Sequence, residues 1–323
     1  MAKPRFIAPM LATLIKEPFD HKDWIFEVKW DGFRALAFTS KRGPKQDPKR
    51  DKVELRSRNN LLWNDKFPAI VQSLEKIKSD LILDGELVVL DSRGKSSFQL
   101  MQNYQMEGKG RLYYYVFDLL YKDGQDLRRW PLIERKALLK KTLQALALPH
   151  IRFSRHIAKK GAAFFKAASK AHLEGIIGKK GSSPYVPKRS RDWVKIKIGL
   201  RQEFVIGGFT APRGSRKKFG ALLIGVYDKL GKLQYVGSVG GGFDAKRLEE
   251  THAKLKSLVT AKSPFALEPR AKESITWVKP HLVCEASFAE WTKEGKLRQP
   301  IFLGLRTDKS PKAVKREKPR LTL

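Results

Sequence analysis

Apolar and polar positions alternate over several short stretches in the first two thirds of the chain, as expected for β-strands with one buried face. Two longer stretches are also strand-like: residues 25–39 are rich in aromatic and β-branched residues, and residues 81–90 form an almost continuous apolar run. Shorter strand-like stretches lie at 53–58, 112–121, 174–179 and 193–198. This part of the chain is therefore predicted to be rich in sheet.

Apolar residues also recur at helical spacing between these strands, which predicts helices over 67–77, 131–146 and 161–173. Pro131 suits the first turn of its helix, because that position needs no backbone N–H donor. Residues 40–52 are charged and turn-rich and separate two strand patterns, so we predict a hairpin across them.

The pattern changes near residue 200, where we place a domain boundary. Short strands separated by glycine-rich turns are predicted at 204–210, 221–227, 233–239, 276–278 and 282–288. One helix is predicted over 248–259, and a last hairpin is predicted to pair 290–292 with 301–305. Gly240–Gly242 is interpreted as a flexible turn. Roughly five strands and one helix are typical of a small β-barrel such as an OB-fold.

The charge balance narrows the class of partner. The 323 residues include 66 Lys and Arg against 33 Asp and Glu, a formal net charge of +33. Such an excess favours a polyanion, because Lys and Arg release counterions from phosphates. No apolar segment approaches the roughly 20 residues that span a bilayer, and the N-terminus lacks the apolar region of a signal peptide. We therefore expect a cytoplasmic protein whose partner is nucleic acid.

Charged side chains interrupt the apolar strands at a few positions. Because alternate residues of a strand share a face, Glu27, Lys29 and Asp31 lie on one side of the first strand. Taken alone, such a stripe is most often a solvated surface. Asp84 and Glu86 interrupt the most apolar strand in the same way, and carboxylates in such a run need a partner or a metal.

Glu174, Lys195 and Lys197 add one acid and two bases to the strands that follow. If all these groups converge, an amine, several oxygen ligands and fixed cations meet in one site. Such a set suits phosphoryl or nucleotidyl transfer, in which carboxylates hold Mg²⁺ and lysines neutralise phosphate charge. A lysine amine attacks phosphorus only in its unprotonated form, which neighbouring cations and partial burial favour. The chain contains no G-x-x-x-x-G-K-[ST] sequence, which excludes a P-loop nucleotide site.

These residues belong to a series of short motifs that closely resembles that of the ATP-dependent DNA ligases, within the superfamily of covalent lysine nucleotidyltransferases. One such motif is weak evidence, but six in order are strong. The motifs are Lys29-Trp30-Asp31-Gly32-Phe33-Arg34 (motif I), Ser57-Arg58-Asn59 (Ia), Leu83-Asp84-Gly85-Glu86 (III), Tyr115-Val116-Phe117-Asp118 (IIIa), Glu174-Gly175-Ile176-Ile177-Gly178-Lys179 (IV) and Trp193-Val194-Lys195-Ile196-Lys197 (V). The resemblance covers nearly all of residues 5–308, and its C-terminal part is most similar to the ligase module of bacterial multifunctional end-joining ligases.

The resemblance implies an α+β fold. A nucleotidyltransferase (adenylation) domain with antiparallel sheets and flanking helices would occupy residues 1–200. A smaller OB-fold β-barrel would occupy 201–308, followed by a basic C-terminal tail over 309–323. It also implies that the chain is an ATP-dependent DNA ligase. Lys29 would attack the α-phosphate of ATP and carry AMP, which passes to a 5′-phosphate at a nick before the 3′-hydroxyl displaces it.

The motif positions imply further roles, which are the following: Glu27 would contact the adenine and Phe117 would stack on it; Arg34 and Arg58 would bind AMP or the 5′-phosphate of the nick; Glu86 would bind the ribose or the metal; Glu174 would hold the metal; Lys195 and Lys197 would hold the α-phosphate; and Arg298 would orient pyrophosphate. The expected cofactors are ATP and Mg²⁺ or Mn²⁺.

The expected substrate is nicked or broken double-stranded DNA, which implies a nucleoid-associated monomer engaged in repair or end joining. A Ku-type end-binding protein is a hypothetical partner. No DNA-encircling, polymerase or nuclease module is recognised, so three basic stretches are hypothesised to contact phosphates: Ser40–Lys52, Arg213–Lys218 and Lys309–Arg320. Two alternatives stay open, an RNA ligase or capping-type nucleotidyltransferase, and a non-catalytic nucleic-acid-binding protein.

Overall fold

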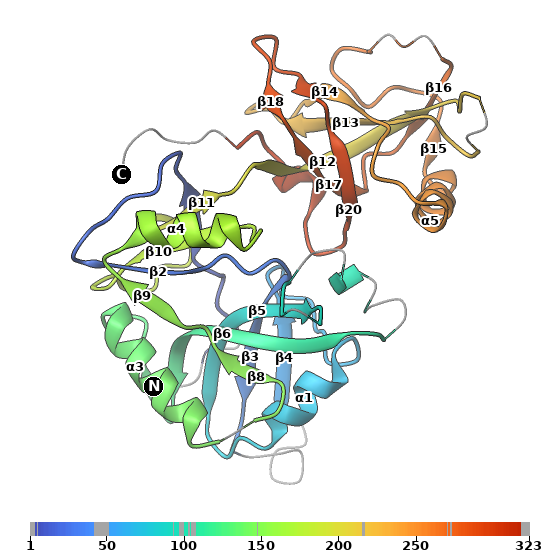
Figure 1. Ribbon diagram of the computed structural model, residues 1–323. Helices are drawn as coiled ribbons and strands as arrows, with labels where there is room; N and C mark the ends of the chain where they lie inside the picture. Colours follow the sequence, from blue (N-terminus) through green and yellow to red (C-terminus); the bar gives the residue numbers. More distant parts are fainter. Residues whose placement is uncertain are drawn as a thin grey trace. The chain divides into compact units, whose positions relative to one another are not determined.

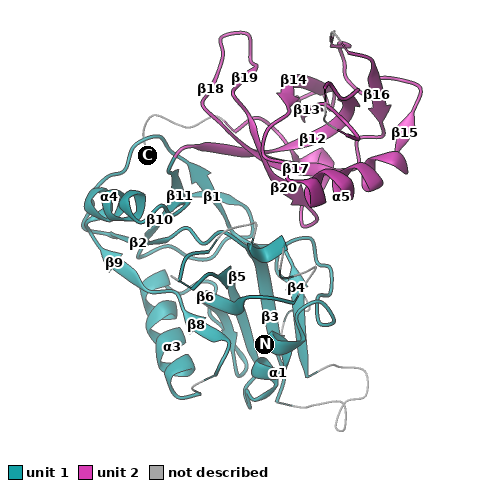
Figure 2. Ribbon diagram, turned by 45° about the vertical axis from the view of Figure 1, so that its right-hand side comes forward, with its two compact units in different colours: residues 1–198, 319–323 teal, residues 199–318 magenta. Residues whose placement is uncertain are grey.

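The computed structural model describes residues 4, 6–41, 52–92, 94–96, 100–102, 104, 108–146, 148–214, 217–269, 271 and 273–317. The chain divides into two compact units, residues 1–198 with 319–323 (unit 1) and residues 199–318 (unit 2), each with its own hydrophobic core (Figure 2). The α+β fold class predicted from the sequence is confirmed. Within the described ranges, no helix is long and apolar enough to cross a membrane.

Unit 1 is built on two sheets (Figure 1). The described residues of the first sheet form, in spatial order, β1 (Leu11–Leu14), β11 (Arg189–Lys197), β10 (Gly175–Lys180), β2 (Trp24–Val28) and β9 (His156–Ala158). Those of the second sheet form β4 (Val53–Ser57), β3 (Phe33–Thr39), β5 (Leu81–Leu90), β6 (Arg111–Lys122) and β7 (Gln125–Asp126), with β8 (Ile151–Phe153) also paired to β6. The predicted hairpin is present, since β3 pairs with β4 from Thr39 to Val53.

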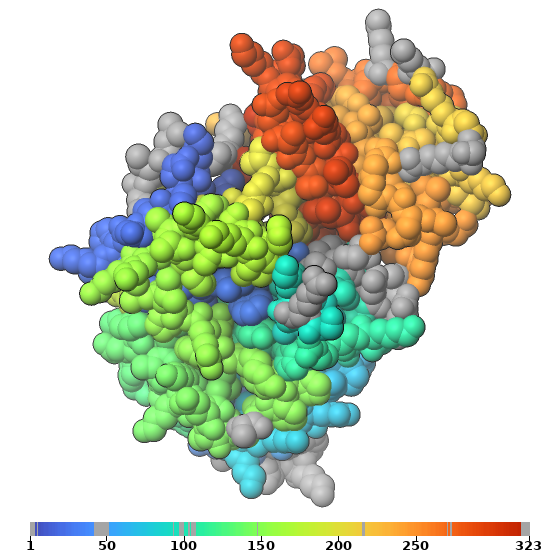
Figure 3. Space-filling model, viewed as in Figure 1, coloured from blue at the N-terminus to red at the C-terminus, as the bar shows by residue number. Residues whose placement is uncertain are grey.

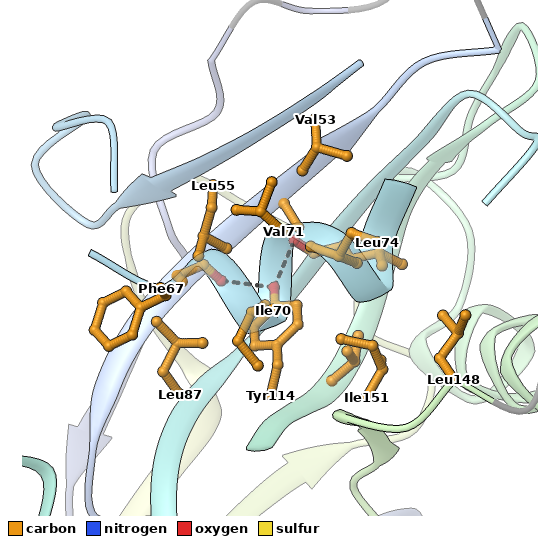
Figure 4. Packing of buried hydrophobic residues seen from close by; sticks show 14 of the residues in the cluster. Val53, Leu55, Phe67, Ile70, Val71, Leu74, Leu87, Tyr114, Leu148 and Ile151 are labelled. Carbon is orange, nitrogen blue, oxygen red and sulfur yellow. Dashed lines mark hydrogen bonds between the residues drawn. The ribbon is translucent and has the colours of Figure 1, made fainter. Parts of the chain in front are cut away.

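The helices that follow β4 and β9 pack on the faces of these sheets that point away from each other. Ile70 and Leu74 of α1 (Pro68–Glu75) pack with Leu55 and Tyr114 of the second sheet (Figure 4). Helix α4 (Gly161–Lys170) packs through Ala168 on the first sheet, and most of its side chains lie on the surface of unit 1 (Figure 3). Helix α3 (Leu132–Gln144) lies beside β6 and β8.

The inner faces of the two sheets meet in an apolar cluster. Ile25 and Trp193 come from the first sheet, and Leu36, Ile82 and Phe117 come from the second. Because side chains alternate along a strand, residues two positions from these also face the space between the sheets. This cluster therefore shows where the two sheets of unit 1 contact each other.

Two strand pairs differ from the predicted antiparallel arrangement. β1 pairs with β11 in parallel, from Leu11 opposite Arg189 to Leu14 opposite Lys195, and β6 pairs with β8 in parallel. The alternating pattern that predicts a strand is the same for parallel and antiparallel neighbours when only one face is apolar, so the sequence carried no signal for these pairings.

Unit 2 contains a curled sheet. Its described residues form β14 (Leu233–Val239), β13 (Leu222–Tyr227), β12 (Leu200–Thr210), β16 (Ile275–Val278) and β15 (Val259–Thr260) in spatial order. β17 (Val283–Phe288) pairs with both β12 and β20 (Ile301–Arg306). A bridge between Gly241 and Ile301 joins the end of β14 to β20 and closes the path β14-β13-β12-β17-β20. Five strands with α5 (Ala245–Lys256) after the third give the topology of an OB-fold.

The predicted pairing of residues 290–292 with residues 301–305 is wrong. β18 (Glu290–Trp291) pairs with β19 (Leu297–Arg298), whereas β20 pairs with β17. Gln299 has a positive φ of 49° and is followed by Pro300, which has no N–H to donate, so the ladder breaks between β19 and β20. The short 3₁₀ turn η1 (Pro311–Ala313) follows.

The glycine run after β14 is also more constrained than a flexible turn. Gly242 has φ 91°, and a Cβ built there would lie 2.2 Å from the carbonyl oxygen of Phe302. Only glycine allows this approach without a backbone shift. The run therefore belongs to the closure of the barrel.

Candidate active site

The strand register of the first sheet brings predicted site residues together. Glu27 on β2 and Lys195 on β11 lie opposite the same residue of β10, Ile177. Two residues farther along β2 and its continuation, the Lys29 N–H donates to the carbonyl of Gly175 (3.0 Å). Since residues opposite each other project from the same face, Glu27, Lys29 and Lys195 share the face that meets the second sheet. Lys197, two positions after Lys195, lies on this face as well.

The second sheet presents a matching row of side chains. Arg34 on β3 lies opposite Glu86 on β5, Glu86 opposite Tyr115 on β6, and Tyr115 beside Arg152 on β8. Leu36, two residues after Arg34, belongs to the apolar cluster between the sheets. The row therefore faces the first sheet, and the two charged rows meet at the same space.

Lys29 and Glu174 form an ion pair between side-chain Nζ and Oε1. The side chains are 19% and 5% exposed, so the pair is shielded while the amine stays within reach of a ligand. The Glu174 carbonyl accepts a hydrogen bond from the Ile198 N–H (2.9 Å), which fixes this end of β10 against β11. The predicted nucleophile and a predicted metal ligand are thus in direct contact.

Gly32 allows the chain after Lys29 to pass close to β5. A Cβ at this position would lie 1.9 Å from the Leu87 carbonyl oxygen and 2.9 Å from a methyl carbon of Val88. Such distances require a backbone shift, so only glycine fits. Asp31 beside it is 7% exposed and accommodated in the same turn. The K-x-D-G sequence thus has a packing reason as well as a chemical one.

Glu27 sits at the centre of a buried polar network. Its Oε1 accepts hydrogen bonds from Lys136 Nζ (2.7 Å) and Lys179 Nζ (3.1 Å), and its Oε2 accepts one from the Ser154 hydroxyl (3.0 Å). Burial alone would raise the pKa of the Glu27 carboxyl, but the ammonium groups of Lys136 and Lys179 hold this pKa below its ordinary value. Glu27 is therefore a buried carboxylate.

Lys179 is held between two aromatic rings. Its Nζ lies 4.2 Å from the ring centroid of Phe117 and 4.2 Å from that of Trp193. Burial lowers the pKa of Lys179 to about 8; Glu27 opposes this shift and Lys136 adds to it. Cation–π contacts partly replace the water that this ammonium loses.

Arg34 is fixed by a carboxylate of the second sheet. Its Nε and Nη2 donate to the two oxygens of Asp84, each at 2.6 Å, and the Tyr185 hydroxyl donates to Asp84 Oδ2 (2.7 Å). The Arg34 guanidinium carbon also lies 4.4 Å from the ring centroid of Phe117. Because Arg34 and Lys179 both lie over Phe117, which is 7% exposed, an adenine base can stack on this ring only if one of the two side chains moves.

Two metal ligands are predicted from the sequence, Glu86 and Glu174. Among the side chains that the structure describes, no group of three or more His, Cys, Asp or Glu is arranged to hold a metal ion. Glu86 and Glu174 provide two carboxylates on the facing sides of the two sheets. This number fits Mg²⁺, which typically takes one or two carboxylates and completes its shell with water and substrate phosphates.

The other predicted residues lie farther along the elements or in unit 2. Arg58 directly follows the last pair of β4, in which Ser57 lies opposite Ala35, so it extends the row that contains Arg34. Arg298 lies on β19 of unit 2, where it donates to Glu290 (2.7 Å) and is 63% exposed.

The three basic stretches are only partly visible, since residues 42–51, 215–216 and 318–320 lie outside the described residues. In the remainder, several cations already have acidic neighbours: Arg213 pairs with Glu273, Lys218 with Glu249 (2.9 Å) and Lys309 with Glu203 (2.9 Å).

The structure adds residues that the sequence reasoning missed, namely Lys136, Ser154 and Tyr185. Lys136 did carry a signal. The buried positions of α3 are Leu132, Arg135, Lys136, Leu139 and Leu143, so two cations stand on the apolar stripe of a helix. Arg135 binds both oxygens of the buried Asp118, each at 2.8 Å. A cation on such a stripe indicates a buried acidic partner.

Two family models match the chain. Residues 9–197 match the ATP dependent DNA ligase domain, and residues 215–309 match the ATP dependent DNA ligase C terminal region. The first match spans more than half of the chain and contains all the strands of the candidate site.

Curated relatives and solved structures agree. The chain is 41% identical over 98% of its length to the multifunctional non-homologous end joining protein LigD of Pseudomonas aeruginosa, but it spans only 37% of that protein. It is 31% identical over 92% of its length to the SPbeta prophage-derived DNA ligase-like protein LigB of Bacillus subtilis, of which it covers 98%. A mycobacterial DNA ligase D complexed with ATP and MES has 37% identity and a TM-score of 0.69, with 96% of this chain and 98% of that chain covered.

Proposed function

Because the chain belongs to the ATP-dependent DNA ligases, we propose that it seals 5′-phosphate/3′-hydroxyl nicks in duplex DNA, with Lys29 as the covalent carrier of AMP. The observation that carries this proposal is the position of Lys29. Its amine contacts Glu174, and Lys195 and Lys197 project from the same face of the first sheet.

In the proposed first step, the Lys29 nitrogen attacks the α-phosphorus of ATP and pyrophosphate leaves. The amine attacks in its unprotonated form, and the proton that it gives up passes to solvent. Lys195 and Lys197 would neutralise the α-phosphate oxygens during the displacement. AMP would then pass to the 5′-phosphate of the nick, and attack by the 3′-hydroxyl would form the phosphodiester and release AMP.

The remaining motif residues have roles compatible with their surroundings. A carboxylate offers about four acceptor positions, and three on Glu27 are used by Lys136, Lys179 and Ser154, so one remains for the exocyclic amine of adenine. Phe117 would stack on the base after Arg34 or Lys179 moves aside. Arg34 and Arg58 would contact AMP or the 5′-phosphate, and Arg298 would orient pyrophosphate.

Mg²⁺ fits the donor set of the site. Glu86 and Glu174 would hold it together with phosphate oxygens, and it would neutralise phosphate charge. Mn²⁺ has similar ligand preferences and would be an alternative.

The biological setting is also part of the proposal. The name of the Pseudomonas aeruginosa relative, a non-homologous end joining protein, supports a role in end joining. We propose a Ku-type end-binding protein as the partner in this role. We propose a cytoplasmic, nucleoid-associated protein, because its proposed substrate is DNA, and we propose that it acts as a monomer. A nick-sealing assay with and without such a partner tests this role, and unchanged sealing in its presence would count against it.

The decisive experiment follows AMP through the reaction. The wild-type chain, incubated with ATP labelled in the α-phosphate, should become labelled and should pass the label to nicked DNA. Lys29→Ala should take up no label, whereas Lys22→Ala, which removes an exposed lysine before β2, should behave as wild type. Labelling of Lys29→Ala would refute the assigned nucleophile. Labelling from GTP alone, or sealing of nicked RNA alone, would favour the RNA ligase or capping alternative.

A further inference from the structure

Ser154 lies in the short connection between β8 and β9 and is completely buried. Its backbone is fixed at both polar groups: the N–H donates to the Val116 carbonyl (2.8 Å), and the carbonyl accepts from Lys136 Nζ (3.1 Å). The position of its side chain is therefore set by β6 and α3.

The Ser154 hydroxyl connects the two sides of Lys29. It accepts a hydrogen bond from the Trp30 indole N–H (3.1 Å) and donates one to Glu27 Oε2 (3.0 Å). Glu27 is two residues before Lys29, and Trp30 is the next residue after it. One hydroxyl thus ties both flanks of the proposed nucleophile to a single buried point.

Trp30 is held a second time on the opposite sheet. Its indole stacks on the ring of Tyr115, with centroids 3.8 Å apart and an interplanar angle of 24°. Tyr115 belongs to β6, the strand whose Val116 carbonyl holds the Ser154 backbone. The turn that carries Lys29 is therefore clamped between Ser154 and Tyr115.

We propose that Ser154 is a positioning residue for the self-adenylation step, an inference that rests on the proposed role of Lys29. Its hydroxyl holds Glu27 and Trp30 so that the amine between them meets the α-phosphorus in line. Ser154 does not touch the reacting atoms. Small displacements of reacting groups slow such steps strongly, and a shift of about 1 Å can cost about 100-fold.

The test separates the step that uses Lys29 from the step that does not. The full chain with Ser154→Ala is mixed with labelled ATP, and the rate of lysyl-AMP formation is measured. The same variant is then given a nick that already carries a 5′-adenylate. Closure of this nick does not need Lys29 as a nucleophile. We expect adenylation to slow at least about tenfold, while closure of the adenylated nick stays within about twofold of wild type. Ser73→Ala is the matched control, because it removes a buried hydroxyl that donates to the Ala69 carbonyl in α1.

Two further variants keep the inference open to refutation. Ser154→Thr retains the hydroxyl and should recover part of the adenylation rate. Trp30→Phe removes the indole donor but keeps a ring on Tyr115, so it should slow adenylation in the same direction even if Ser154→Ala fails to fold. Equal loss in both steps, or wild-type adenylation in Ser154→Ala or Trp30→Phe, overturns the positioning role. If wild type itself takes no label while it closes the adenylated nick, the lysyl-AMP proposal fails instead.

Discussion

Lys136 Nζ lies 2.7 Å from Glu27 Oε1, although the two residues are 109 positions apart and their side chains are only 1% and 2% exposed. Lys179 contacts the same oxygen from β10. Helix α3, strand β2 and strand β10 therefore meet at one carboxylate. A buried ion pair contributes little when compared with a well-packed apolar replacement, but the removal of one partner leaves an uncompensated charge. This asymmetry makes the network testable.

Replacement of Lys136 by Met should destabilise unit 1 by about 2–4 kcal/mol, since Glu27 would keep only Lys179 and Ser154 as partners. Urea unfolding followed by tryptophan fluorescence measures this change. Lys140→Met, on the exposed side of the same helix, should stay within about 0.5 kcal/mol of wild type. A loss below about 1 kcal/mol for Lys136→Met would show that the network tolerates the deletion.

Lys179 should give the native state an unusual alkaline stabilisation. Its folded pKa of about 8 lies below the ordinary lysine value of 10.5. Between these values the unfolded chain binds a proton that the native chain does not, so stability rises with pH. The unfolding free energy of wild type should rise relative to Lys179→Met by about 3 kcal/mol from just below pH 8 to above pH 10. Urea titrations of both proteins across this range measure the difference, and a constant gap would contradict the assignment.

Glu285 should make the stability of unit 2 rise with pH as well, but in the acid range. Burial would raise the pKa of this carboxyl, but Arg306 (2.9 Å) and Arg201 (2.8 Å) lower it to about 2. Its stabilising contribution is therefore present above pH 4.5 and is lost as pH falls toward 2, by about 3 kcal/mol in total.

Native-state hydrogen exchange on peptides from β12 and β17 reports this contribution, after correction for intrinsic exchange at each pH. Near neutral pH, the free energy of opening measured by exchange should be higher for wild type than for Glu285→Gln. This difference between the two proteins should disappear as the pH falls toward 2. Glu290→Gln, which breaks an exposed pair with Arg298, should show no such gap. A gap that persists at the lowest pH would exclude Glu285 as its source.

Gly32→Ala should damage both stability and adenylation. The new methyl group would meet the Leu87 carbonyl oxygen at 1.9 Å, so the turn after Lys29 must shift. We expect a loss of about 3 kcal/mol and adenylation slower by at least about 100-fold. Gly241→Ala has no described heavy atom within 4 Å of the new methyl group and should stay near wild type in both measurements. Normal adenylation by Gly32→Ala would show that the turn adapts.

The sequence predicted where the strands lie better than it predicted which strands pair with each other. Strict alternation located β11, and runs of apolar, aromatic and β-branched residues located β2, β5 and β6, because burial leaves these marks on a strand's own residues. Register is a property of two strands that are distant in the chain, so the alignment of Glu27 with Lys195 across β10 could not be read from either strand. The partner of β20 was missed for the same reason.

Some site residues carry a signal in the sequence and others do not. Lys29, Glu86 and Glu174 were predicted as site residues because charged residues are conspicuous in apolar strands and because they lie in motifs that resemble those of a known family. Lys136 could have been found from its place on the buried stripe of α3. Ser154 gave no such sign, since a small polar residue between two short strands is ordinary in any loop, and its importance lies only in what it contacts.

The pairing of β1 with β11 has a consequence for the synthesis of the protein. The strand that holds Leu14 is synthesised well before Lys195, its partner, which is made only when unit 1 is nearly finished. Lys29 likewise precedes Glu174 and Lys179 by most of the domain. A nascent chain therefore carries the proposed nucleophile long before the rest of the proposed site exists, so we expect no consumption of ATP until translation has passed β11. Chains ended after Lys170 should take no label from ATP, and labelling of such a fragment would show that the missing strands are dispensable.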